Sequence, residues 1–273
     1  MHSAVDDHID VAALDADLAG TRFVGKLQYF PSIGSTSSHA MAQADAGAPD
    51  GAVYFADEQT AGRGRSAHGW ASPAGSGLYV SVVLRPAMAP ADALWMSLAA
   101  GLAVREAVRQ VTSLECDLRW PNDLLFGARK FCGILTEMNA EATRVRHVVI
   151  GMGINVHQPS FPEDLRGIAT SLHIETGRDW PRQDLLTALL RALDSEVNAL
   201  AAPGGLDAAT AEIRARLERA STWIRGKRVY VEEMDGYAGV TEGLDARGFL
   251  RIRTAEGLKT VLSGGVREQI QNR

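Results

Sequence analysis

Three segments of the chain combine residue types that suit the binding of an anion. The first runs from Glu58 to Trp70 and holds three glycines between positions 62 and 69, which favours a loop over a helix or strand. Within it Arg63 and Arg65 alternate with glycines, so that backbone amides can approach an anion while guanidinium groups neutralise it. An isolated sequence of this kind is more often a surface turn with two solvated arginines.

The second segment joins a Pro-Asn-Asp turn at 121–123 to an apolar stretch that begins at Lys130. The chain has only four lysines but 24 arginines, which suggests that Lys130 was selected as a compact point charge for a phosphate or carboxylate. Asn122 and Asp123 have the donor types that bind Mg²⁺ or orient a hydroxyl. Taken alone, the turn is explained more simply by ordinary turn chemistry.

The third segment, residues 151–156, ends an apolar run with two glycines and Asn155. Glycines there permit close approach of a ligand, and Asn155 offers a donor and an acceptor, although a glycine-rich strand end is an equal explanation. The common nucleotide motifs do not apply. Neither the helix nor the acidic residue of a dinucleotide fingerprint follows the first segment, and the sequence has no Walker A loop.

Hydrophobic periodicity predicts the elements that position these segments. We expect strands at 21–30, 52–59, 77–85, 115–120, 130–138 and 145–156, and helices at 37–47, 91–111, 182–200 and 206–221. From Gly226 the pattern alternates with period two between glycine turns, which predicts a small all-β domain. The fold class is therefore an α+β domain with a mixed sheet, at 21–223, followed by a small SH3-like β-barrel at 224–273.

Charge is distributed unevenly along the chain. The net charge is −5, and residues 1–20 carry five aspartates without a single Lys, Arg or Glu, so the remainder is balanced. We expect this leader to be flexible. It lacks the features of an export signal, and no apolar run approaches the roughly 20 residues that span a membrane. Two cysteines make no disulfide framework, so we expect a cytoplasmic protein, and the balanced body disfavours nucleic-acid binding.

Taken together and in order, the segments resemble the biotin–protein ligases (biotin–[acetyl-CoA-carboxylase] ligases). That family carries a Gly-Arg-Gly-Arg loop ending in Trp, a Lys-Trp-Pro-Asn-Asp segment, a Lys-x-x-Gly-Ile-Leu strand and a Gly-x-Gly-Ile-Asn strand, and each has a counterpart here. An earlier Ser35-Thr36 resembles the family's Ser-Thr-Asn. The resemblance covers residue 22 to the end. It departs from the family at Ala67 and His68 in place of Gly-Arg, at Arg119 in place of Lys, and at Ser37 in place of Asn.

The resemblance implies a two-step reaction. A biotin carboxylate attacks the α-phosphate of ATP to give biotinyl-5′-AMP, and an acceptor lysine then takes the biotin. Lys130 and Arg65 would be catalytic, with ATP and biotin as substrates and Mg²⁺ supplied with the nucleotide. The implied biotin-binding residues are Ser35, Thr36, Ser37, Gln59, Arg63, Gly64, Arg65, Lys130 and Gly133. The implied ATP and adenylate residues are Trp70, Arg119, Asn122, Asp123 and Asn155.

The implied partner is the biotin carboxyl carrier domain of a biotin-dependent carboxylase. A leader of twenty residues with five aspartates cannot form the N-terminal DNA-binding domain of the larger family members, so we expect the monofunctional form, without DNA or membrane partners, as a monomer or weak homodimer. Two alternatives stay open. One is a lipoate-type protein ligase, and the other is a non-catalytic module that binds biotin or an adenylate.

Overall fold

The computed structural model describes residues 7–65, 68–201, 205–233, 235–262 and 265–269. The helices are α1 (Val11–Asp17), α2 (Thr36–Asp45), α3 (Leu94–Thr112), α4 (Leu172–Thr176), α5 (Arg182–Leu200) and α6 (Leu206–Ala220). The strands are β1 (Leu27–Ile33), β2 (Val53–Gln59), β3 (Gly77–Leu84), β4 (Asp117–Arg119), β5 (Asp123–Phe126), β6 (Arg129–Ala140), β7 (Val145–Asn155), β8 (Arg225–Val231), β9 (Tyr237–Leu244), β10 (Leu250–Thr254), β11 (Gly257–Val261) and β12 (Val266–Glu268).

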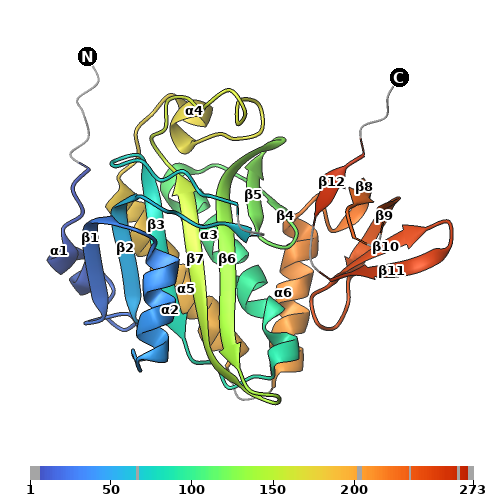
Figure 1. The fold of residues 1–273 in the computed structure, drawn as a ribbon, viewed down its shortest axis with the longest axis horizontal. Helices are drawn as coiled ribbons and strands as arrows, with labels where there is room; N and C mark the ends of the chain where they lie inside the picture. The colour runs from blue at the N-terminus through green and yellow to red at the C-terminus, as the bar shows by residue number, and fades with distance from the viewer. Residues whose placement is uncertain (1–6, 66–67, 202–204, 234, 263–264, 270–273) are drawn as a thin grey trace.

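A mixed sheet of seven strands forms the centre of the larger part of the protein. Its strand order is β1-β2-β3-β7-β6-β5-β4. The β1 and β2 strands pair in parallel, because α2 connects them, whereas the other neighbours pair antiparallel. Figure 1 shows α2 on one face of this sheet and α3 with α5 on the other. The sheet is thus covered on both sides, and all eight residues of β3 are buried.

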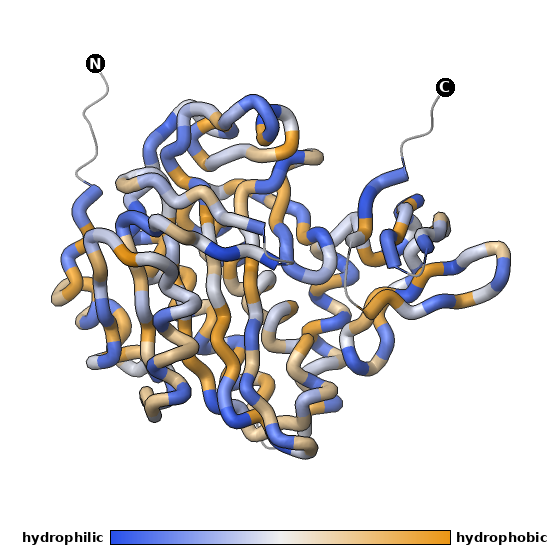
Figure 2. The backbone as a smooth tube through the Cα atoms, in the orientation of Figure 1, coloured by the Kyte–Doolittle hydropathy of each residue, from blue (hydrophilic) through white to orange (hydrophobic). Residues whose placement is uncertain are grey.

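The apolar core lies between the sheet and the pair α3 and α5. Helix α3 is buried over most of its circumference, which agrees with its nearly continuous apolar sequence. At Gly101 the sheet approaches it so closely that a Cβ atom would lie 2.7 Å from Cδ1 of Leu118. Apolar stretches follow the central strands and polar ones the surrounding loops (Figure 2).

The C-terminal part is a separate antiparallel sheet of five strands, in the order β11-β10-β9-β8-β12. It is joined to the larger part by a hydrogen bond from Nε1 of Trp120 to the carbonyl oxygen of Gly248, 2.9 Å long. Trp120 belongs to the Pro-Asn-Asp segment, so the position of that turn is tied to the second sheet. The predicted fold class, a mixed-sheet α+β domain followed by a small all-β domain, is confirmed.

Two differences from the sequence-based expectations lie near the N-terminus. Residues 21–25 form turns rather than the start of a strand, and β1 begins at Leu27, because Gly20 and Gly25 adopt positive φ angles. Residues 7–20 do not behave as the expected flexible leader. Asp10 caps α1 through its side chain, and Leu14 and Leu18 are completely buried against the body. Residues 1–6 of the leader lie outside the described residues.

No helix within the described ranges has the length and apolar character that would let it cross a membrane.

Burial of Leu14 predicts that the leader contributes to stability. Replacing Leu14 by Ala should lower the free energy of unfolding by about 2–5 kcal/mol, the usual cost of truncating a fully buried leucine. Val24→Ala, at a side chain that is 42% exposed, is the matched control and should change it by less than about 0.5 kcal/mol. Urea unfolding of both variants checks this, and equal midpoints would show that the leader is not docked.

Candidate active site

All three anion-binding segments meet at one small cavity. Its volume is about 40 Å³, which is room for only a few water molecules. The walls come from the N-terminus of α2, the end of β2 and its following loop, β6 and β7. The lining residues are Thr36, Ser37, Gln59, Arg63, Gly64, Arg65, Trp70, Asn122, Lys130, Gly133, Ile134, Leu135, Gly151, Met152 and Gly153. Side chains therefore fill most of the space, and an organic ligand has to displace some of them.

One end of the cavity is a network of neutral polar groups. The Oε1 atom of Gln59 accepts from the backbone N of Thr36 at 2.9 Å and from its Oγ1 at 3.0 Å. The Nε2 atom of Gln59 donates to Ser72 Oγ at 2.8 Å. Ser81 Oγ lies 2.8 Å from Thr36 Oγ1 and 3.1 Å from Ser37 Oγ. The network offers hydroxyl and amide groups, both donors and acceptors, at the edge of an apolar core.

The floor of the cavity consists of glycines that lie against Trp70. A Cβ atom on Gly153 would lie 2.4 Å from Nε1 of Trp70, and one on Gly133 would lie 3.0 Å from its ring. In the part of the chain that the structure describes, the buried Nε1 of Trp70 has no hydrogen-bond partner. An unsatisfied buried donor is costly, so this indole is suited to an acceptor atom of a ligand.

The other end of the cavity is cationic. Lys130 Nζ lies 2.6 Å from Oδ1 of Asp123, and Arg119 Nη2 lies 2.6 Å from Oδ2 of the same carboxylate. Burial by itself would raise the pKa of Asp123, but the two adjacent cations outweigh it and hold that pKa below its ordinary value. The ionised Asp123 fixes Lys130 beside the ring of Trp70, with Nζ 5.2 Å from the ring centroid.

The two loop arginines cross the cavity from β2 towards β6. Arg65 Nη1 donates to Oδ1 of Asn122 at 3.0 Å. Arg63 pairs with both carboxylate oxygens of Glu137 on β6, at 3.0 and 2.7 Å. Asn122 is itself oriented, because its Nδ2 donates to the carbonyl oxygen of Ile134 at 2.8 Å. The loop therefore lies over the cavity in this structure. Ala67 of the predicted loop lies outside the described residues.

Four predicted site residues do not line the cavity. Ser35 is the N-cap of α2, and Arg119 and Asp123 lie behind Lys130. Asn155 is buried and donates from Nδ2 to the carbonyl oxygen of Thr170 at 3.0 Å. It fixes the segment 156–171, which also covers Lys130, since the backbone N of Lys130 donates to the carbonyl oxygen of Ile168 at 2.8 Å. These four residues position groups that reach the cavity.

Three polar residues of the site were not predicted from the sequence: Ser72, Ser81 and Glu137. Ser81 carried a signal, because it is the single serine inside the apolar run of β3, where a buried polar group needs a partner. Ser72 and Glu137 carried none, since their importance arises from pairing across the cavity.

The donor set does not fit a Mg²⁺ ion held by the protein alone. Both carboxylate oxygens of Asp123 face cationic side chains, and the described residues contain no group of three or more His, Cys, Asp or Glu placed to hold a metal.

Comparisons with known proteins agree with this geometry. The model of the biotin/lipoate A/B protein ligase family matches residues 29–155. The biotin–[acetyl-CoA-carboxylase] ligase of Mycobacterium tuberculosis is 36% identical over 85% of this chain and 84% of its own length. The bifunctional ligase/repressor BirA of Bacillus spizizenii is 35% identical over 88% of this chain and 73% of its own. The chain belongs to the biotin protein ligase family.

The fold supports membership of the biotin protein ligase family over nearly the whole chain. The biotin protein ligase from Aquifex aeolicus, solved in complex with biotin and ATP, superposes with a TM-score of 0.77 at 30% identity. The match covers 90% of this chain and 100% of that one, so it includes the C-terminal sheet. The resemblance to the biotin–protein ligases, which the four sequence motifs indicated, is confirmed.

The coupling of Asp123 to its two cations predicts a measurable titration. In the wild type, Asp123 should stay ionised below the ordinary aspartate pKa of about 3.9. In Lys130→Met one cation is removed while the burial remains, so the pKa of Asp123 should rise. Because a depressed pKa stabilises the fold above the unfolded-state value, this contribution is lost as the pH falls through the folded-state pKa.

Carboxyl ¹³C chemical shifts of Asp123, followed against pH, measure its pKa in the wild type and in Lys130→Met. Lys259→Met, a replacement in the C-terminal sheet, is the control and should leave the titration of Asp123 unchanged. Identical curves for the wild type and Lys130→Met would contradict the ion pair.

Proposed function

We propose that the protein activates biotin with ATP as biotinyl-5′-AMP and transfers the biotin to a lysine of a carrier protein. The observation that carries the proposal is the polarity of the cavity, with a neutral hydrogen-bonding end at Gln59 and a cationic end at Lys130. Biotin has the matching asymmetry, because a neutral ureido ring and a carboxylate lie at its two ends. The Aquifex aeolicus relative, whose structure holds biotin and ATP, supports the same substrates.

The neutral end suits the ureido group. A buried amide-like group costs several kcal/mol unless its donors and acceptors are satisfied. Thr36, Ser37 and Ser81 supply hydroxyls that donate or accept as required, and Gln59 supplies an amide. Because the cavity of about 40 Å³ is too small for such a ring, we propose that Trp70 shifts as biotin enters.

The cationic end suits the first chemical step. The biotin carboxylate and the α-phosphate of ATP repel each other, so bringing them together requires positive charge fixed in place beforehand. Lys130, Arg63 and Arg65 provide it. The carboxylate of biotin acts as the nucleophile and pyrophosphate leaves, so the protein itself needs no nucleophilic side chain. We propose that Mg²⁺ arrives with the nucleotide.

The loop suits the second step. The mixed anhydride must be protected from water until the acceptor lysine attacks its carbonyl carbon, which forms an amide and releases AMP. A loop anchored to β6 through Arg63 and to the Pro-Asn-Asp turn through Arg65 gives that protection.

The further assignments follow from this function. We propose a biotin carboxyl carrier domain of a carboxylase as the partner, a cytoplasmic location, and the division into a catalytic domain at 21–223 and a smaller domain at 224–273. The individual roles of the fourteen residues assigned above to biotin and adenylate binding are proposals of the same kind. The chain would act as a monomer or weak homodimer.

One assay separates this proposal from its alternatives. The full chain, MgCl₂ and ATP are mixed with biotin or with lipoate, and pyrophosphate release is followed. We expect release with biotin only. Release with lipoate only would make it a lipoate-type ligase, and release with neither would make it a binding module.

Lys130→Ala should lower the rate with biotin at least about a hundredfold, the typical effect of removing one preorganised charge.

The protective role of the loop predicts that biotinyl-5′-AMP escapes when the loop loses an anchor. In Arg65→Gly the hydrogen bond to Asn122 is lost, so biotinyl-5′-AMP should escape and label lysines of a bystander protein such as serum albumin. Arg251→Gly in β10 is the control, because it removes the same side chain in the other sheet. Mass spectrometry counts the labelled lysines. Bystander labelling equal to that of the control would refute a protective role for Arg65.

A further inference from the structure

A buried arginine connects the acidic leader to the strands that carry the cavity. Arg182, at the first turn of α5, has a side chain that is only 8% exposed and forms ion pairs with two carboxylates, Asp7 of the leader and Asp57 of β2. Its Nε pairs with Asp7, and its Nη1 lies 2.7 Å from Oδ1 of Asp57. Nη1 also donates to the carbonyl oxygen of Gly77, the first residue of β3, at 3.2 Å. One side chain thus joins the leader, β2 and β3.

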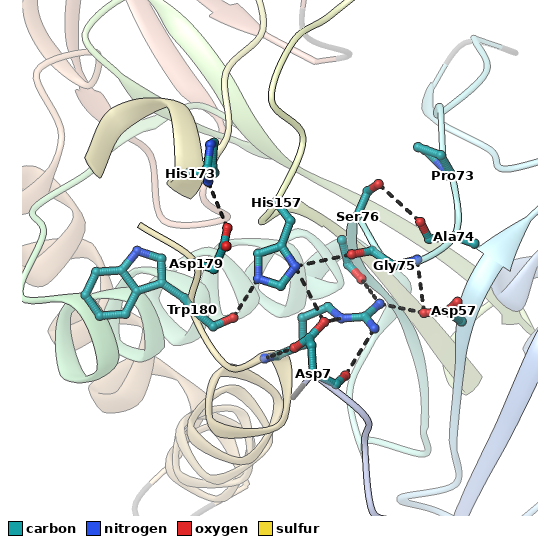
Figure 3. Close-up of polar contacts among 12 residues, drawn as sticks. Asp7, Asp57, Pro73, Ala74, Gly75, Ser76, His157, His173, Asp179 and Trp180 are labelled. Atoms are coloured by element: carbon teal, nitrogen blue, oxygen red, sulfur yellow. Dashed lines mark hydrogen bonds and ion pairs between the residues drawn. The ribbon is translucent and has the colours of Figure 1, made fainter. Parts of the chain in front are cut away.

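His157 makes a second connection at the same place. Its Nδ1 lies 3.2 Å from the carbonyl oxygen of Gly75 and 3.5 Å from Oδ2 of Asp7, and its Nε2 lies 2.8 Å from the carbonyl oxygen of Trp180 (Figure 3). All three partners are acceptors, so the ring of His157 lies between the carbonyl oxygens of Gly75 and Trp180, with the carboxylate of Asp7 beside Nδ1.

The segment held at this junction is the turn 73–76, which follows directly on the loop that covers the cavity. Gly75 N donates to Asp57 Oδ1 at 3.1 Å, and the backbone N of His157 donates to the carbonyl oxygen of Ser76 at 2.8 Å. Just before the turn, the backbone N of Gln59 donates to the carbonyl oxygen of Ser72 at 3.0 Å. A displacement of the turn therefore reaches Gln59 and the C-terminal stem of the loop.

We infer that Asp7 is a positioning residue of the active site, which acts through Arg182 and His157 on the turn 73–76 and so keeps the loop closed over its ligand. This inference deepens the proposed function and rests on it for the identity of the ligand. The leader then contributes to the catalytic domain by positioning the turn 73–76. The carboxylate of Asp7 is a counter-ion of Arg182 and lies beside the ring of His157.

The test compares Asp7→Asn with Asp17→Asn in the full chain. Both remove one negative charge from the leader, but Asp17 is exposed and lies at the end of α1, where its backbone oxygen accepts from Arg191 of α5. Asp7→Glu keeps the charge and serves as the conservative variant. Release is measured by chasing bound, labelled biotinyl-5′-AMP with excess unlabelled biotin and ATP. The Michaelis constant for biotin and kcat are measured separately. All measurements are made well below the melting temperature of each variant.

We expect Asp7→Asn to release biotinyl-5′-AMP about three to ten times faster and to raise the Michaelis constant for biotin in proportion, with kcat at saturation within about twofold, as loss of one charge-assisted contact predicts. Asp17→Asn should match the wild type, and Asp7→Glu should recover most of the retention. Equal release from Asp7→Asn and Asp17→Asn, even with a lower melting temperature for the former, would reduce Asp7 to a structural residue and overturn the inference.

Amide hydrogen exchange makes the outcome independent of the ligand. The amides of Gly75 and Gln59 should exchange faster in Asp7→Asn than in Asp17→Asn, because their acceptors are held by the junction. Unchanged exchange at both amides would overturn the inference even if adenylate were formed. Faster exchange in a chain that makes no biotinyl-5′-AMP would instead reject the proposed function and leave the junction in place.

Discussion

The active site depends on one buried carboxylate. Asp123 is held in its ionised form by Lys130 and Arg119, and in return it fixes both cations before any substrate is present. Burial penalises the charge of the Asp123 carboxylate, and the two adjacent cations outweigh that penalty. The short turn between β4 and β5 places Asp123 opposite β6, and the bond from Trp120 to Gly248 ties that turn to the C-terminal sheet. The positive end of the cavity is consequently a product of the whole fold.

The remainder of the site is arranged so that an anion can replace existing contacts. Arg63 and Arg65 have protein partners, Glu137 and Asn122, that a bound anion can replace. Glycines on β6 and β7 admit the ring of Trp70 where any Cβ atom would collide with it. The cavity is small, so a ligand that enters it exchanges protein contacts for ligand contacts. Exchange of this kind favours a ligand that offers both a hydrogen-bonding ring and negative charge.

Much of the fold and of the candidate site was predictable from the sequence, and the exceptions have physical causes. The helices at 182–200 and 206–220 follow from uninterrupted periodicity, and the glycine and arginine loop follows from composition. The three segments were expected to converge only because of their family resemblance, since no local pattern reports a distance across a sheet. Glu137 and Ser72 were missed for that reason. The leader was expected to be flexible because of its acidic composition. Its apolar residues Leu14 and Leu18 instead dock it, because both are completely buried against the body.

Synthesis of biotinyl-5′-AMP by the Asp123→Asn variant tests the central claim most directly. The amide nearly matches the carboxylate in shape but carries no charge, so it leaves Lys130 and Arg119 without their counter-ion. With biotin, ATP and MgCl₂ supplied at saturation, we expect the rate of adenylate formation to fall at least about tenfold, while circular dichroism shows an unchanged fold. A variant that forms biotinyl-5′-AMP at the wild-type rate would contradict the view that Asp123 holds the cations in their working positions.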